Sequence, residues 1–194
     1  MIKNIIKVLI GLQMVIVALI GYIPQLEYLI ELTCVSNVLG GVLLITDGIL
    51  GIIKKKVHLT FFYSNVVVSI DIVFIICMVS FLMGIYKFNF SGAFFFLHVI
   101  NPLIFTICYI LFVNEQNRKN KSIMNSTIMI VLYLIFDYIR YQFTGKFIYG
   151  FVNINEISII KKIIACVVIY TFICLFSLIL FTLNKFIHKK YQLQ

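Results

Sequence analysis

The sequence predicts an all-α integral membrane protein, a bundle of six transmembrane helices that forms one domain over residues 1–194. Hydrophobic residues make up 62% of the chain and charged residues 12%, against about 45–50% and about 25% in soluble globular proteins. A small soluble core has no room for this much apolar surface, so the solvent should be lipid. Apolar runs of about 20 residues, enough to cross the hydrocarbon layer at about 1.5 Å per residue, occur six times.

The six helices are expected at about residues 5–23, 32–53, 61–86, 93–113, 123–143 and 159–183. Pro24 should end the first helix, because proline lacks the N–H group that continues a helix. Pro102 lies inside the fourth helix and frees the carbonyl of His98, which should open the helix beside that histidine. The segment TGKFIYGFVNINEI (144–157) is too polar and too rich in glycine to span, and it is predicted as an external loop or a partly re-entrant one.

The distribution of basic residues predicts the orientation. Alternate connections carry eleven Lys and Arg residues on one side and five on the other. The larger set is Lys3, Lys7, Lys54, Lys55, Lys56, Arg118, Lys119, Lys121, Lys185, Lys189 and Lys190, and the smaller is Lys87, Arg140, Lys146, Lys161 and Lys162. The side richer in basic residues is cytoplasmic, so both termini should be cytoplasmic. The protein is expected in the cell membrane if the chain is bacterial. Anionic lipid headgroups explain the net charge of +9 without a nucleic-acid partner.

The second helix carries polar and small side chains on one face. Steps of four and three residues place on that face Thr33, Asn37, Gly40, Leu44, Asp47 and Gly51. Such a face belongs in the bundle interior. The fourth helix carries a matching stripe, formed by Phe94, His98, Asn101, Phe105 and Cys108. We therefore expect the two helices to face each other and Thr33 to meet His98.

Four reactive or charged side chains should share one layer below the outer headgroups. Thr33 lies near the outer start of its helix and His98 about five residues into its own. Asp137 and Arg140 lie a similar distance from the outer end of the fifth helix. The ester groups of lipids lie at this depth.

Acyl transfer is the chemistry that this layer favours. A threonine hydroxyl becomes an effective nucleophile when a base takes its proton, and His98 is the only imidazole within the predicted spans. The oxyanion should be stabilised by the N–H groups at the start of the second helix, helped by Asn37, Asn101 or Arg140. The structural alternatives are that Thr33 caps its helix and that His98 is a packed, hydrogen-bonded side chain.

Three carboxylates within the predicted spans need partners, because an intramembrane charge costs roughly 2.5–3.5 kcal/mol on insertion scales. Asp47 and Asp71 are expected either to be protonated and hydrogen-bonded to each other or to belong to an ion or proton path. Asp137 is expected to pair with Arg140, three residues later on the same face, or to orient the His98 imidazole.

Cysteine and histidine spacing indicates neither a metal site nor a cofactor. The five cysteines lie in apolar runs without CxxC spacing, which is typical of small buried side chains: Cys34, Cys77, Cys108, Cys166 and Cys174. His58 and His188 lie in basic flanks, away from His98. We expect no metal and no soluble cofactor.

Three patches of sequence resemble a known family, the androgen-induced and androgen-dependent six-pass membrane hydrolases and their bacterial six-pass relatives. The patches are LTCVSNVL in the second helix, FLHVINP in the fourth, and YIRYQFTGKFIYGF at the end of the fifth and after it. The resemblance implies a threonine hydrolase for fatty acid esters of hydroxy fatty acids, with Thr33 and His98 at the catalytic positions. Arg140 and Tyr149 fall on matching positions of the third patch. More distant six-pass acyltransferases pair cysteine with histidine, which makes Cys34 an alternative nucleophile.

The function predicted from the sequence is hydrolysis of a lipid or fatty-acyl ester within the membrane by a Thr33 nucleophile and a His98 base. Supporting roles are expected for Asn37, Asn101, Asp137, Arg140 and Tyr149. The rival predictions are a membrane transporter or partner protein with a polar Asp and Arg path, and a related acyltransferase.

Overall fold

The computed structural model describes residues 1–55, 57–84, 87, 89–115, 122–148 and 159–191. Every regular element in these residues is a helix. Five helices among them are long and apolar enough to cross a membrane: Ile2–Ile30, Leu32–Ile52, Thr60–Leu82, Gly92–Phe112 and Cys166–Tyr191. Their number and composition indicate an all-helical, multi-pass membrane protein.

The first two helices follow the expected boundaries closely. Helix α1 (Ile2–Tyr22) gives way to a 3-10 segment, η1 (Ile23–Ile30), whose first turn contains Pro24. Proline therefore ends the first helix, as predicted. Within η1 the backbone leaves helical geometry at Gln25, with φ −140° and ψ 73°, and the chain turns back into α2 (Leu32–Ile52).

The opening predicted beside His98 is present as a π-helical turn. After α3 (Thr60–Leu82), a continuous helical stretch comprises α4 (Gly92–Phe95), the π-turn η2 (Phe96–Ile100) and α5 (Asn101–Phe112). Pro102 has no N–H group to offer the His98 carbonyl, so the backbone widens one turn before the proline. The histidine thus lies on a distorted turn, a common place for functional side chains.

The fifth predicted helix, 123–143, is broken in the structure. A single turn, α6 (Ser122–Asn125), is followed by a turn and then by α7 (Ile128–Thr144). The Thr127 hydroxyl donates to the Met124 carbonyl at 2.8 Å, a local bond that competes with helix continuation. At 17 residues, α7 is about 25 Å long, whereas the hydrocarbon core is about 30 Å thick, and it is not one of the five candidate spans.

The last helix is longer than predicted. Helix α8 runs over Ile159–Tyr191, beyond the expected end at residue 183, and its last turn contains His188, Lys189 and Lys190. Basic side chains at a helix C-terminus stabilise it through the helix dipole. Asn184 fixes this extension: its amide donates to the carbonyls of Tyr109 and Val113 at 3.0 and 2.8 Å. The Val113 carbonyl, just past the end of α5, thereby gains a hydrogen-bond donor that the helix itself does not supply.

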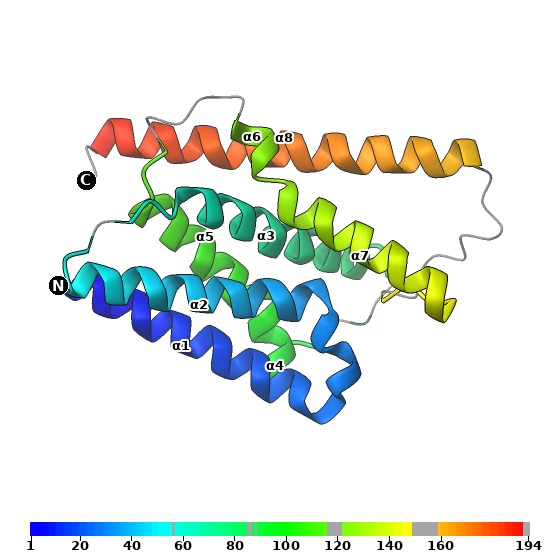
Figure 1. Ribbon diagram of the computed structural model, residues 1–194, viewed down its shortest axis with the longest axis horizontal. Coiled ribbons are helices and arrows are strands. Elements are labelled where there is room, and N and C mark those ends of the chain that lie inside the picture. Colours follow the sequence, from blue (N-terminus) through cyan, green and yellow to red (C-terminus); the bar gives the residue numbers. More distant parts are fainter. Residues whose placement is uncertain (56, 85–86, 88, 116–121, 149–158, 192–194) are drawn as a thin grey trace.

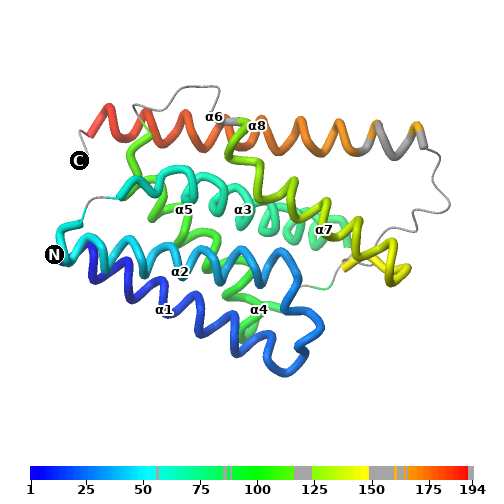
Figure 2. The backbone as a smooth tube through the Cα atoms, viewed as in Figure 1, coloured from blue at the N-terminus to red at the C-terminus, as the bar shows by residue number. Residues whose placement is uncertain are grey.

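The helices run alternately toward and away from the end of the bundle that holds the start of α1 and the end of α8 (Figures 1 and 2). We call the opposite end, which carries η1 and the end of α7, the distal end. Between α1 and α2 the backbones approach closely: a Cβ added at Gly11 would lie 2.5 Å from the Gly41 carbonyl oxygen. Small residues permit this approach, as is common between membrane helices.

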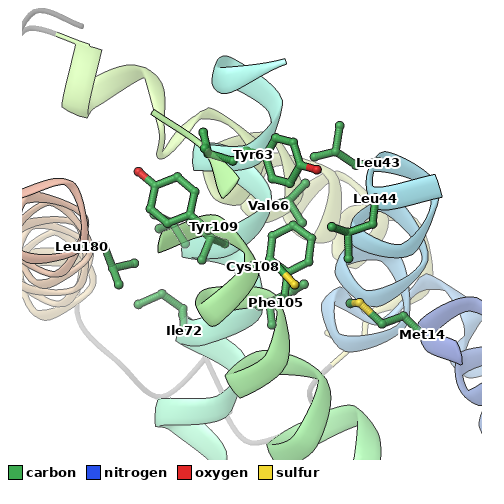
Figure 3. Packing of buried hydrophobic residues seen from close by; sticks show 14 of the residues in the cluster. Met14, Leu43, Leu44, Tyr63, Val66, Ile72, Phe105, Cys108, Tyr109 and Leu180 are labelled. Atoms are coloured by element: carbon green, nitrogen blue, oxygen red, sulfur yellow. The ribbon is translucent and has the colours of Figure 1, made fainter. Parts of the chain in front are cut away.

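The hydrophobic core joins α1, α2, α3, α5, α7 and α8 (Figure 3). Met14 and Phe105 are fully buried in it, and the rings of Tyr63 and Phe105 stack with centroids 5.9 Å apart. This core lies beside the polar layer described next and fixes how α2 and α5 face each other.

Candidate functional site

Thr33 is a buried side chain at the distal start of α2. It is 1% exposed and occupies the second helical position. The residue that caps the helix is Glu31, which makes no side-chain capping bond. Thr33 therefore does not serve as the N-cap, and the backbone N–H groups of the first turn of α2 lie around it.

His98 lies on the π-turn, half-buried, against its own preceding turn. Its Nδ1 lies 3.0 Å from the Phe94 carbonyl oxygen, and its ring stacks on the Phe94 ring with centroids 4.0 Å apart. A carbonyl only accepts, so we assign the proton to Nδ1, which leaves the Nε2 lone pair available. The Phe94 carbonyl orients the imidazole, whereas Asp137, one of whose two expected roles was to orient it, accepts the Ile148 N–H with its Oδ1.

The Asn37 amide joins the Thr33 segment to the His98 segment. Its Nδ2 donates to the Thr33 carbonyl at 2.8 Å and to the Leu97 carbonyl at 3.2 Å. The two segments therefore lie side by side in one layer, as the matching stripes predicted. The bridge is this amide and not a hydrogen bond from Thr33 to His98.

Asn37 belongs to an amide relay across three helices, which we define as Gln13, Asn101 and Asn37; Gln13 is half-buried and the other two are buried. Gln13 Nε2 donates to Asn101 Oδ1 at 2.9 Å, and Asn101 Nδ2 donates to Asn37 Oδ1 at 2.7 Å. Asn37 and Asn101 are 1% and 0% exposed. Both amide hydrogens of Asn37 are used within the bundle, so it positions α2 and η2 instead of donating to an oxyanion.

Gln13 was not among the predicted site residues. The available signal was its position as a polar side chain in the middle of an apolar helix, but the sequence does not show which neighbouring helix it meets. A buried amide in a membrane helix finds a partner on another helix, because lipid offers none.

Asp137 and Arg140 organise the turn after α7. Asp137 Oδ1 accepts the Ile148 N–H at 2.9 Å, and Arg140 Nη1 donates to the Lys146 carbonyl at 3.1 Å. Gly145 makes the reversal possible with φ +67°. No ion pair joins the two side chains, since each points to a backbone group of the returning chain. Tyr149, predicted to support the site, lies outside the described residues.

The other two carboxylates have separate partners, which corrects the predicted pairing between them. Asp47 Oδ2 lies 2.5 Å from Lys7 Nζ and accepts the Tyr63 hydroxyl at 2.7 Å. Asp71 accepts the Thr106 hydroxyl at 2.7 and 2.8 Å. Each group is satisfied by a different neighbouring helix, because their depths and helix faces differ.

The cysteine nearest to the site is Cys34, which was the alternative nucleophile. Cys34 is 3% exposed and packs in a small apolar cluster with Ala18, Tyr22 and Leu97. Cys34 and Cys108 are buried, whereas Cys166 is exposed. Within the described part of the chain, no group of three metal-ligating side chains is close enough to hold an ion.

Comparisons with protein-family models, with curated proteins and with solved structures find no match for this chain. Fold and site together define a class of protein: an all-helical membrane protein with a buried polar layer near one end. In that layer a threonine and a histidine are carried by adjoining helical segments.

Proposed function

We propose that the protein is an intramembrane lipid ester hydrolase in which Thr33 is the nucleophile and His98 the base. One observation carries the proposal: the Asn37 amide binds the backbone of Thr33 and the backbone of Leu97, the residue before His98. The likeness of these segments to the six-pass membrane hydrolases supports the same assignment.

The reaction uses groups that the chain itself supplies. His98 Nε2 takes the proton of the Thr33 hydroxyl as its oxygen attacks the ester carbonyl, and the proton then passes to the departing alkoxide. Water hydrolyses the acyl-threonine by the same route and releases the fatty acid. Backbone N–H groups of the first turn of α2 stabilise the oxyanion. The two side chains come within hydrogen-bond distance when substrate is bound, as is common for catalytic pairs.

A transporter with a continuous acidic path has less support. Asp47, Asp71 and Asp137 are each bound to partners on different segments. Their arrangement is that of three local polar contacts.

The test is hydrolysis of a panel of fatty-acyl esters, including esters of hydroxy fatty acids, by purified protein in lipid nanodiscs. Thr33→Ala and His98→Ala should each lower kcat/KM by at least about 100-fold, and Thr33→Ser should retain part of the activity. Thr171→Ala is the matched control, since Thr171 is an exposed helical threonine bonded to its own helix. Full activity of Thr33→Ala would overturn the proposal.

Labelling by a fluorophosphonate gives a second readout. The label should require both Thr33 and His98. If labelling persists in both variants while Asp47→Asn and Asp71→Asn abolish solute flux in proteoliposomes, the protein is a transporter.

A further inference from the structure

Two lysines, Lys3 and Lys7, lie one turn apart on α1, and both reach the Phe112 ring at the end of α5. Their Nζ atoms lie 5.1 and 5.5 Å from the ring centre. These residues lie at the end of the bundle that holds the start of α1, opposite the distal end (Figure 1). An aromatic ring attracts an ammonium group, but two ammonium groups on one ring repel each other. Packing of this pair therefore needs negative charge nearby.

Asp47 supplies that charge to Lys7 and leaves the charge of Lys3 in excess. Its Oδ2 lies 2.5 Å from Lys7 Nζ, and Lys7 is 5% exposed, so this ion pair is shielded from solvent. Lys3 is half-buried, and it forms no ion pair or hydrogen bond through its side chain within the described part of the chain. Two ammonium groups thus share one carboxylate among the described residues.

The other described carboxylates do not compensate Lys3. Glu115, which follows α5, is fully buried and accepts the Tyr109 hydroxyl at 3.2 Å. The remaining described acidic residues lie toward the distal end or bind Thr106, and they are Glu27, Glu31, Asp71 and Asp137. Residues 116–121, outside the described part, contain three basic residues and no acidic one. A counterion for Lys3 should therefore come from outside the chain.

The end of α2 adds two exposed lysines next to the start of α1. The two helices are in close contact here, since a Cβ added at Gly51 would collide with the Asn4 side chain. Lys54 and Lys55 follow within about one turn, and both are exposed. The Lys55 N–H donates to the Leu50 carbonyl at 2.9 Å, which fixes the backbone of this pair against the end of α2. Positive charge is thereby gathered where α1 starts and α2 ends.

The surface next to Lys3 on α1 is apolar, and this favours a lipid over a free anion. Ile6 and Ile10 lie three and seven residues after Lys3, on the same side of the helix. Ile6 is exposed and Ile10 is half-buried. The ammonium group of a lysine in the first turn of a span reaches the headgroup layer, while hydrocarbon covers the turns that follow. A lipid can therefore place its headgroup at Lys3 and its chains along Ile6 and Ile10.

We propose that Lys3 binds the phosphate group of an anionic phospholipid where the start of α1 faces the end of α5. Its ammonium group donates to a phosphate oxygen, and the phosphate supplies the counterion that the chain does not. The Phe112 ring holds the Lys3 side chain at this place, and Lys54 and Lys55 raise the positive potential that attracts the headgroup. The site lies at the opposite end of the bundle from Thr33, so it does not depend on the proposed hydrolase activity.

A single tryptophan placed at the site can report which lipid occupies it. The chain contains no tryptophan, and Phe112→Trp keeps an aromatic face for both ammonium groups. Phospholipids with brominated acyl chains quench a tryptophan that they contact. In nanodiscs, quenching by brominated phosphatidylglycerol and by brominated phosphatidylcholine gives the relative binding constant of the two lipids at this position. Phe186→Trp is the matched reporter, because Lys190 Nζ lies 6.0 Å from the Phe186 ring centre near the end of α8.

Phosphatidylglycerol should be preferred at Phe112→Trp by about fivefold or more, the gain expected from one lysine near an anionic lipid surface. Adding Lys3→Gln to this variant should abolish the preference. Adding Lys190→Gln, which removes the same charge from the same end of the bundle, should leave it unchanged. At Phe186→Trp the preference should be weaker, because only the general surface potential acts there. Equal preferences at the two reporters, or no loss with Lys3→Gln, would overturn the proposal.

Asp47→Asn should act in the opposite direction. It removes the carboxylate that compensates Lys7, while its amide oxygen can still accept the Tyr63 hydroxyl, so the preference for phosphatidylglycerol at Phe112→Trp should rise. Circular dichroism checks that this variant is folded, and an unchanged preference in the folded variant would contradict the charge count. Inorganic phosphate, compared with chloride at equal ionic strength, should not displace the lipid. If it does, the site binds a free anion and the lipid assignment is wrong.

Discussion

Three amide side chains hold the candidate site together at the scale of single residues. Gln13, Asn101 and Asn37 come from α1, α5 and α2, and each satisfies the next. Neutral amides avoid the cost of buried charge, yet their two-sided bonding fixes both the depth and the rotation of each helix. The relay thereby sets where Thr33 and His98 lie relative to each other.

Replacing Asn101 by leucine should uncouple this relay. Asn101→Leu leaves Asn37 Oδ1 and Gln13 Nε2 without their partner, and we expect the free energy of unfolding to fall by about 1–2 kcal/mol. The measurement is unfolding in mixed micelles followed by circular dichroism. Esterase activity per folded molecule should also fall, since Thr33 and His98 lose their alignment.

The matched test is a double-mutant cycle with Asn37→Leu. Removing both amides leaves fewer unsatisfied groups than the two single changes suggest, so the double variant should be more stable than additivity predicts. Strictly additive effects would show that the relay does not act as a unit.

At the scale of elements, the α1–α2 pair depends on backbone contact at Gly11 and Gly41. Gly11→Ala places a Cβ 2.5 Å from the Gly41 carbonyl oxygen. Relieving this contact requires the two helix backbones to move apart, so we expect the free energy of unfolding to fall by about 1–3 kcal/mol. Gly40→Ala is the control, because its new Cβ meets only side-chain ends, at 3.0–3.1 Å. Equal losses in the two variants would contradict close backbone packing as the cause.

The junction of η1 and α2 should respond to pH through Glu31. Burial raises the pKa of its carboxyl above the ordinary value of 4.5, and the Tyr22 hydroxyl, which donates to Oε2 at 2.8 Å, partly opposes the shift. A carboxyl with a raised folded pKa binds its proton more tightly in the folded state. Its contribution to stability is therefore full below 4.5 and is lost as pH rises through the folded pKa.

Glu31→Gln keeps an acceptor for Tyr22 and removes the titration. The difference in unfolding free energy between this variant and the wild type should grow in favour of the variant as pH rises from 4.5 toward neutrality. Tyr22→Phe should move the transition to higher pH, because the opposing hydrogen bond is gone. Parallel pH curves for the wild type and Glu31→Gln would refute this assignment.

At the scale of the whole molecule, the start of α1 and the end of α8 lie at one end of the bundle, opposite η1 (Figure 1). If the short α7 crosses the membrane with the five candidate spans, the termini lie on the same side, and the basic flanks predict that this side is cytoplasmic. Green fluorescent protein fused at residue 1 or at residue 194 should then be fluorescent, and alkaline phosphatase fused at either residue should be inactive.

A phosphatase fusion at Gly145, at the distal end of α7, is the opposite control. It should be active, because this position lies across the membrane from the termini. Termini found on opposite sides would show that α7 does not cross.

The sequence by itself determined the local structure. The second helix, expected at 32–53, is observed at Leu32–Ile52, because hydrophobic length and periodicity act within one segment. The end of α1 at Pro24 and the π-turn before Pro102 were predictable for the same reason. So was the meeting of α2 with the His98 segment, since their polar stripes cannot face lipid.

Only the tertiary structure decided which side chains bind each other. The extension of α8 held by Asn184, the separate partners of Asp47 and Asp71, and the place of Gln13 in the relay all depend on other helices. A one-residue rotation or a few ångströms of depth changes every such contact without altering any local pattern.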